Sequence, residues 1–183
     1  MHKAIFMDRD GTVSEEMGYV SDAKMYRPFP WTGSAISRIN ESGMKAILVT
    51  NQSGIGRGYF SEGTLGEVHG VLKAELDKWN AHLDAIYYCP HTPDAGCDCR
   101  KPKAGMLLRA RQEMNIDLES SYVIGDRYLD IAMGHAVGAR TILVLTGDGA
   151  AELGNRKGEA VQPHYVAENL MSAVHAIVNG EVG

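Results

Sequence analysis

Two aspartates lie two positions apart in the segment "DRDGT", directly after the short apolar run "AIFM". Of the two carboxylates, Asp8 and Asp10, one can attack an electrophile while the other transfers protons. A carboxylate is a weak nucleophile toward phosphorus unless the charge of the phosphoryl group is neutralised. Asp and Gly are also ordinary turn residues. The pair therefore indicates phosphoryl-transfer chemistry only if other segments supply cations and hydrogen-bond donors.

The segment "GDRYLD" supplies two more carboxylates, Asp126 and Asp130. They are hard oxygen donors of the kind that Mg²⁺ prefers. Asp126 could instead cap a helix that begins here, which is a common role of aspartate. Because capping does not need the second carboxylate, we favour a magnesium site.

Thr50 in "TNQS" and Lys101 in "RKP" complete the set. The Thr50 hydroxyl can donate a hydrogen bond to a phosphoryl oxygen, although a polar residue at the end of a strand is commonplace. The Lys101 ammonium is a point charge that tolerates the changing geometry of phosphoryl transfer. Without its neighbours, Lys101 would be interpreted as a solvated surface lysine.

All three cysteines of the chain lie in the segment "CPHTPDAGCDC", together with one histidine. Three thiolates and one imidazole are enough to close a tetrahedral zinc site, and a site with four protein ligands is structural rather than catalytic. Unpaired buried cysteines or a redox pair are the alternatives, but the segment contains no Cys-x-x-Cys. We predict a zinc-binding loop over 89–103, with the ligands Cys89, His91, Cys97 and Cys99.

The elements that must position these side chains follow from short apolar runs separated by segments of helical period. Uninterrupted apolar runs of this length suit strands that are buried on both faces. They occur at 4–7, 46–49, 85–88, 122–125 and 141–145. We expect helices from Trp31 to just before Gly43, from near Ser61 through the stripe Leu65, Val68, Leu72, Leu76 and Trp79, and at 104–114, 129–137 and 167–178; the segment 146–164 is predicted to be a polar surface loop.

Strands that alternate with helices predict an α/β fold with a Rossmann-like, mostly parallel sheet covered by helices on both faces. Ligands of open α/β sheets bind outside the carboxyl ends of the strands. The polar residues that follow four of the predicted strands should therefore share one site.

Composition excludes several classes of function. The 183 residues suit a single domain, 1–183, and no apolar run approaches the ~20 residues that span a bilayer. The start of the chain lacks the features of a signal peptide, so we expect a cytoplasmic protein without a membrane partner. A net charge of −5 argues against a nucleic-acid partner.

The four motifs, in this order, resemble those of the haloacid dehalogenase (HAD) superfamily of Mg²⁺-dependent phosphohydrolases. The resemblance implies that Asp8 is the nucleophile that becomes an aspartyl phosphate, and that Asp10 is the general acid and base. It implies that Thr50 and Lys101 hold the phosphoryl oxygens. Mg²⁺ would be bound by the Asp8 carboxylate, the Asp10 carbonyl and Asp126, with Asp130 acting indirectly.

Large cap domains of this superfamily are inserted after the first motif or between the second and third. Here those positions hold only residues 13–30 and 52–84. We therefore expect a capless member whose selectivity comes from loops.

The cysteine segment followed by Arg-Lys-Pro is similar to the branch that contains the D-glycero-D-manno-heptose-1,7-bisphosphate 7-phosphatases and the histidinol-phosphate phosphatases. "EEMGYV" and "NQSGIGRGYF" resemble the heptose enzymes, which implies a small phosphorylated sugar as substrate and removal of its 7-phosphate. The implied substrate contacts are Glu16, Gly18, Tyr19, Asn51, Gln52 and Ser53.

Three arginines beside separate motifs, Arg57, Arg100 and Arg127, provide more cationic donors than one transferring phosphoryl group needs. A second phosphate on the substrate would use them, because arginine binds phosphate through two hydrogen bonds. The cationic amine of histidinol phosphate would be repelled. Surface salt bridging is the alternative role, for Arg57 in particular.

The predicted protein is a monomeric phosphatase with catalytic Mg²⁺ and structural Zn²⁺. Histidinol phosphate remains an alternative substrate. Two other classes remain open: a zinc-stabilised nucleic-acid-binding module, and a phosphoaspartate receiver, which lacks the second aspartate of the first motif.

Overall fold

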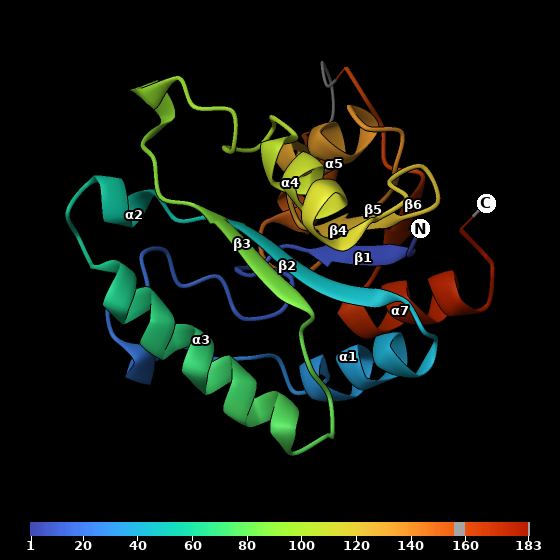
Figure 1. The fold of residues 1–183 in the computed structure, drawn as a ribbon, viewed down its shortest axis with the longest axis horizontal. Coiled ribbons are helices and arrows are strands. Elements are labelled where there is room, and N and C mark those ends of the chain that lie inside the picture. Colours follow the sequence, from blue (N-terminus) through green and yellow to red (C-terminus); the bar gives the residue numbers. More distant parts are fainter. Residues whose placement is uncertain (156–159, 183) are drawn as a thin grey trace.

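A computed structural model describes residues 1–155 and 160–182. Its strands form one sheet in the order β3-β2-β1-β4-β5-β6, and every neighbouring pair is parallel (Figure 1). The strands are β1 (Ala4–Met7), β2 (Lys45–Asn51), β3 (Ala85–Cys89), β4 (Tyr122–Gly125), β5 (Arg140–Val144) and β6 (Tyr165–Ala167). The five predicted strands are therefore confirmed, and β2 extends to include Thr50 and Asn51.

Helices cover both faces of this sheet, as the alternation of elements predicts. Helices α1, α3 and α7 lie on one face, and α4 and α5 lie on the other (Figure 1). The helices are α1 (Thr32–Glu41), α2 (Ser53–Gly56), α3 (Glu62–Asp77), α4 (Gly105–Met114), α5 (Tyr128–His135), α6 (Gly149–Gly154) and α7 (Leu170–Val178). Two short 3₁₀ turns, η1 (Ala23–Met25) and η2 (Pro93–Ala95), lie in loops.

Strand β1 shows why its run is apolar without interruption. Ile5 and Met7 pack into the core beneath α1, α3 and α7, whereas Ala4 and Phe6 pack into the core beneath α4 and α5. Successive side chains of a strand point to opposite faces. A central strand with a core on each face must therefore be apolar at every position.

Helix α3 follows the predicted stripe except at its end. The Ser61 hydroxyl accepts a hydrogen bond from the backbone N–H of Thr64 at 3.1 Å and caps the helix. The four leucine and valine positions of the stripe are buried. The prediction that Trp79 belongs to this stripe is wrong, because Trp79 follows the end of the helix and is 46% exposed. Its indole lies against Gly33 of α1, where a Cβ atom would come within 2.0 Å of the ring.

For the C-terminal part, the predicted helix at 167–178 is confirmed with a later start, and the predicted loop at 146–164 is wrong in part. The segment 167–178 begins with the last residue of β6, and α7 starts only at Leu170, after the side-chain cap of Asn169. The segment 146–164 contains the short helix α6 rather than only loop. Residues 156–159 of that segment lie outside the described residues.

The segments available for a cap are used by the core fold itself. Residues 52–84 contain α2 and α3, and α3 packs against the sheet. The capless architecture is thus confirmed. Within the described ranges, no helix has the length and apolar character needed to span a bilayer.

Candidate active site

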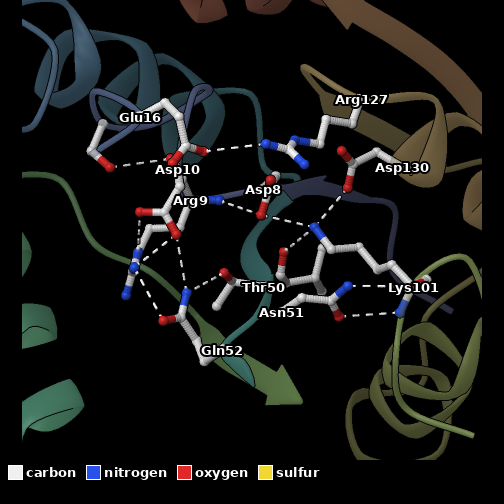
Figure 2. A network of polar contacts seen from close by, with 12 residues as sticks. Asp8, Arg9, Asp10, Glu16, Thr50, Asn51, Gln52, Lys101, Arg127 and Asp130 are labelled. Carbon is white, nitrogen blue, oxygen red and sulfur yellow. Dashed lines mark hydrogen bonds and ion pairs between the residues drawn. The ribbon is translucent and has the colours of Figure 1, made fainter. Parts of the chain in front are cut away.

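The carboxyl ends of β1, β2 and β4 open on a cavity of about 270 Å³. Residues from segments far apart in the sequence gather in this region (Figure 2). The cavity is lined by Asp8, Asp10, Glu16, Gly18, Tyr19, Thr50, Asn51, Gln52, Ser53, Arg100, Lys101, Arg127, Leu129 and Asp130. The predicted convergence of motifs at one edge of the sheet is therefore found.

Asp8 is the first residue after β1 and is only 8% exposed. Its Oδ1 accepts a hydrogen bond from the backbone N–H of Arg9 at 2.7 Å and lies 2.8 Å from Lys101 Nζ. Its Oδ2 receives no hydrogen bond from any residue that the structure describes. One oxygen is thus fixed in position while the other keeps its lone pairs available.

Asp126 follows β4 and is fully buried beside Asp8. Its Oδ2 accepts a hydrogen bond from the backbone N–H of Asp148 at 2.9 Å, whereas Oδ1 is buried without a partner. Helix α5 has Arg127 at its N-cap position, so Asp126 does not cap that helix. The alternative role as a helix cap is therefore excluded.

Two glycines with positive φ make room for the Asp126 carboxylate. Gly11 has φ +84° and Gly147 has φ +56°. A Cβ atom on either one would lie 2.0 Å or 2.2 Å from Asp126 Oδ2. Only glycine combines this backbone conformation with this close approach.

The carboxylates of this pocket suit a divalent cation. One oxygen from each of Asp8, Asp126 and Asp130 lies within 4.8 Å of the others. Burial, with further contributions from the two neighbouring carboxylates, raises the pKa of Asp126 to about 8. A cation reverses such a shift because it favours the charged form. The unpartnered Oδ1 and the hard oxygen donors fit Mg²⁺.

Asp10 belongs to a second, partly buried network beside Asp8 (Figure 2). Arg9 donates to both of its oxygens, from Nε to Oδ1 at 2.9 Å and from Nη2 to Oδ2 at 2.7 Å. Gln52 Nε2 donates to Oδ2 at 3.1 Å. Burial raises the pKa of Asp10 above its usual value, while the neighbouring Arg9 opposes this shift.

Thr50 and Lys101 have the surroundings that phosphate ligands need. The Thr50 hydroxyl oxygen accepts a hydrogen bond from Gln52 Nε2 at 2.8 Å, which leaves its own proton available for donation. Asn51 holds the backbone of Lys101, since its Oδ1 accepts from the Lys101 N–H at 3.1 Å and its Nδ2 donates to the Lys101 carbonyl at 3.4 Å. Asn51 therefore contributes to the position of the lysine.

The rim of the cavity comes from loops. Glu16 Oε1 accepts a hydrogen bond from the backbone N–H of Gly18 at 2.7 Å, and Tyr19 packs edge-on against Tyr59 with ring centroids 4.9 Å apart. Arg127 Nη2 pairs with Asp148 and lies 3.9 Å from Glu16 Oε2. These contacts give the rim a defined shape.

The three arginines predicted to bind substrate do not occupy equivalent positions. Arg100 and Arg127 line the cavity, whereas Arg57 does not line it and is exposed. Arg100 Nη1 donates to the carbonyl of His91 at 3.2 Å. Two guanidinium groups, rather than three, therefore face the cavity in this structure.

The cysteine segment brings its four predicted ligands together. One atom each of Cys89, His91, Cys97 and Cys99 lies within 4.8 Å of the others. The Sγ atom of Cys89 lies 3.6 Å from that of Cys97 and 3.2 Å from that of Cys99. These separations are longer than a disulfide bond, which is about 2.05 Å. They are close to the S···S distance of roughly 3.8 Å expected between two thiolates that bind one Zn²⁺ ion tetrahedrally with Zn–S bonds of about 2.3 Å. The cluster fits a tetrahedral metal ion.

Sequence reasoning missed three residues of this region: Arg9, Leu129 and Asp148. Arg9 separates the two predicted aspartates, yet it is 1% exposed and turned toward Asp10. Leu129 adds an apolar side chain to the cavity. Asp148 lies in the segment interpreted as a surface loop, although its backbone N–H reaches Asp126.

A Rossmann-like sheet with this set of carboxylates, threonine and lysine at its carboxyl edge defines a HAD-type phosphohydrolase. The comparisons with known proteins agree. The HAD-hydrolase-like family model matches residues 98–173. The structure of D,D-heptose 1,7-bisphosphate phosphatase from B. bronchiseptica, complexed with magnesium and phosphate, has a TM-score of 0.91 and 32% identity, and the alignment covers 97% of this chain and 99% of that one.

Curated relatives narrow the family. The D-glycero-β-D-manno-heptose-1,7-bisphosphate 7-phosphatase of Haemophilus ducreyi is 40% identical over 167 residues, covering 87% of this chain and 92% of the relative. The enzyme of the same name from Pasteurella multocida is 40% identical over 177 residues, covering 93% and 94%. The chain belongs to the family of D-glycero-β-D-manno-heptose-1,7-bisphosphate 7-phosphatases, within the HAD-type phosphatases.

Proposed function

We propose that this chain removes the 7-phosphate of D-glycero-β-D-manno-heptose 1,7-bisphosphate. The observation that carries the chemistry is the buried, unpartnered Oδ1 of Asp126 beside Asp8, a residue that lines the cavity together with Asp10 and Lys101. Support for the substrate comes from the relatives that bear this name and from the two arginines of the cavity.

Asp8 is the proposed nucleophile. Its Oδ1 is held by Lys101 and by the backbone of Arg9, so its Oδ2 can be presented to phosphorus. Asp8, Asp126 and the backbone carbonyl of Asp10 would hold Mg²⁺, which supplies positive charge against the phosphoryl oxygens when it is bound. Thr50 donates its hydroxyl proton to a phosphoryl oxygen.

Asp10 is the proposed general acid and base. It protonates the oxygen at C7 as that oxygen leaves phosphorus, and it then accepts a proton from the water that attacks the aspartyl phosphate. The raised pKa of Asp10 favours the protonated form that the first step needs. The same carboxyl group thus serves both half-reactions.

The loops would hold the rest of the substrate. Glu16, Gly18, Tyr19 and Ser53 line the cavity and are proposed to contact the sugar. Arg100 and Arg127 are proposed to bind the phosphate at C1 through paired hydrogen bonds. For Arg127 this requires an exchange of partner, because it is paired with Asp148 in this structure.

The proposed cofactors are catalytic Mg²⁺ and structural Zn²⁺ bound by Cys89, His91, Cys97 and Cys99. We further propose a monomer that acts in the cytoplasm. A nucleic-acid-binding module is disfavoured by the net charge of −5.

A panel of substrates tests the function. We expect kcat/KM with Mg²⁺ to be highest for the β anomer of heptose 1,7-bisphosphate, lower for the α anomer and much lower for histidinol phosphate. Preference for histidinol phosphate would refute the proposed substrate while leaving the phosphatase chemistry intact. Rapid multiple turnover on any of these esters would exclude a receiver.

A further inference from the structure

We propose that Arg9 and Gln52 are positioning residues that orient the Asp10 carboxyl group so that Oδ1 is the atom that transfers the proton. This inference rests on the proposed phosphatase function. Beyond that function, it gives a role to the buried side chains of Arg9 and Gln52, which need not touch the substrate.

The contact between Arg9 and Asp10 is a paired one. Arg9 Nε donates to Asp10 Oδ1 at 2.9 Å and Arg9 Nη2 donates to Oδ2 at 2.7 Å, so the planar guanidinium group and the carboxyl group share two roughly parallel hydrogen bonds. Two such bonds fix the rotation of the carboxyl group as well as its distance. A single bond would leave that rotation free.

Gln52, the first residue after β2, supports the same orientation. Its Nε2 donates to Asp10 Oδ2 at 3.1 Å and to the Thr50 hydroxyl oxygen at 2.8 Å, and its Oε1 accepts from Arg9 Nη2 at 3.2 Å (Figure 2). Its side-chain amide is thus engaged within the protein at both ends. Gln52 is also only 4% exposed, which favours a positioning role over direct contact with the sugar.

The hydrogen bonds distinguish the two oxygens of Asp10. Oδ2 accepts from both Arg9 Nη2 and Gln52 Nε2, whereas Oδ1 accepts only from Arg9 Nε among the described residues. A carboxylate oxygen has two acceptor positions. Oδ1 therefore keeps one lone pair, and Asp10 lines the cavity. The geometry assigns the proton to that position.

Arg9 is itself held in a fixed place. It is 1% exposed, and its guanidinium carbon lies 5.6 Å from the ring centroid of Tyr26. A buried charge is tolerated only where it is paired and hydrogen-bonded. Asp10 and Gln52 supply partners for Nε and Nη2, while Nη1 is buried without a partner among the described residues. The orientation of Asp10 and the burial of Arg9 therefore depend on each other.

The proposed orientation serves both steps. In the first, an Asp8 oxygen forms a bond to phosphorus, the bond from phosphorus to the leaving oxygen breaks, and the proton on Asp10 Oδ1 moves to that oxygen. In the second, Asp10 Oδ1 takes a proton from water, the water oxygen bonds to phosphorus, and the bond to Asp8 breaks. Phosphate is released, and both carboxyl groups return to their starting states.

The test uses leaving groups that differ in their need for a proton. Rates of phosphoenzyme formation are measured with enzyme in excess, for heptose 1,7-bisphosphate and for 4-nitrophenyl phosphate, whose phenolate leaves without protonation. We expect Arg9→Met to slow the sugar reaction by about 10- to 100-fold, as a misplaced catalytic group does. The 4-nitrophenyl reaction should change by less than about threefold, since general acid catalysis contributes little there.

Further variants separate positioning from folding. Gln52→Leu keeps the ion pair of Arg9 but removes one donor to Asp10 Oδ2 and the donor to Thr50, so it should slow both reactions, and the sugar reaction more than the other. Arg9→Lys can supply only one directed bond and should recover part of the rate lost in Arg9→Met. If Arg9→Met does not fold, these two variants decide the matter.

Arg109→Met is the matched control. Arg109 also pairs with a carboxylate, Glu113, at 2.8 Å and lies 5.4 Å from the ring centroid of Tyr87, but it is exposed and outside the cavity. This variant should react like the wild type with both substrates. Equal losses on the two substrates in the Arg9 and Gln52 variants, or no loss, would overturn the proposal.

Failure of the positioning role of Arg9 and Gln52 can be distinguished from failure of the proposed function. If the wild type prefers another alkyl phosphate, the proposed substrate fails, and the same comparison is made with that ester against 4-nitrophenyl phosphate. If Asp8→Asn keeps its turnover, the phosphatase mechanism fails whatever the Arg9 variants do.

Discussion

Lys101 Nζ lies 2.7 Å from Asp130 Oδ1, and both side chains are buried. The same nitrogen lies 2.8 Å from Asp8 Oδ1. Burial alone would lower the pKa of Lys101, but the two carboxylates outweigh burial and raise it, so the ammonium group stays charged. Asp130 therefore fixes the lysine beside the nucleophile, which is an indirect contribution to the site.

Asp130→Asn tests this role. The variant should lower kcat by about 10-fold or more, because Lys101 loses the carboxylate that holds it. Its Mg²⁺ affinity, measured by calorimetry, should fall much less than that of Asp126→Asn. Equal losses of Mg²⁺ affinity in the two variants would show instead that Asp130 binds the metal.

Asp126→Asn should stabilise the fold when no metal is bound. Burial raises the pKa of Asp126 to about 8, well above the value of about 4 in an unfolded chain. The folded state then binds more protons between pH 4 and pH 8, so stability falls as pH rises through that window. Asparagine removes this cost. In EDTA at pH 8, Tm should rise by at least about 2 °C, the effect of roughly 1 kcal/mol in a domain of this size.

Thermal unfolding from pH 5 to pH 8 provides the measurement for Asp126→Asn. Without metal, the difference in Tm between variant and wild type should grow as pH rises. Saturating Mg²⁺ should raise Tm of the wild type and leave the variant nearly unchanged. A variant that is less stable than the wild type in EDTA at pH 8 would contradict the assignment of Asp126 as a buried, unneutralised carboxylate.

Removal of zinc should impair catalysis without removing any reacting atom. Arg100 donates to the carbonyl of the proposed zinc ligand His91, and Lys101 follows directly. Binding energies of structural Zn²⁺ are about 10 kcal/mol or more in small zinc modules, enough to hold an irregular loop. We expect Cys97→Ala to lose zinc and to show a raised KM or a lowered kcat.

Elemental analysis and steady-state kinetics on the same preparation check the zinc prediction. Asp94→Asn is the control, since Asp94 is exposed in the same loop and offers no ligand to the cluster. Full activity in a folded, zinc-free Cys97→Ala protein would show that the loop holds Arg100 and Lys101 without the metal.

The parts of this fold that sequence predicts are those fixed by burial. Strands β1 and β4 match the predicted bounds because both of their faces are covered, so every position is apolar. Strand β6 was not predicted because it has only three residues and lies at the edge of the sheet. Helix α6 was not predicted because glycines at both of its ends, Gly149 and Gly154, weaken the helical pattern of the sequence.

The site divides in the same way. The placement of Asp8 and Asp126 follows from topology, because parallel strands bring their carboxyl ends to one edge. The direction of Arg9 does not follow, since arginine is mostly exposed and spacing alone cannot distinguish a buried one. Arg57 shows the converse, as it lies near a motif in sequence but outside the cavity lining.

Asp8→Asn should abolish turnover while the fold remains intact. Asparagine keeps an oxygen that can accept the hydrogen bonds from Lys101 and from the backbone of Arg9. The neutral amide is a poor nucleophile, so kcat should fall by at least about 10³-fold, as expected when a nucleophile is removed. Unfolding curves and mass spectrometry of quenched reactions provide the measurements, with Asp98→Asn as a control at an exposed aspartate.

The wild type and the control should form a phosphorylated chain, and Asp8→Asn should not. Retained turnover in Asp8→Asn would mean that Asp8 is not the nucleophile. If water activated by Asp10 attacked phosphorus directly, no variant would form a phosphorylated chain.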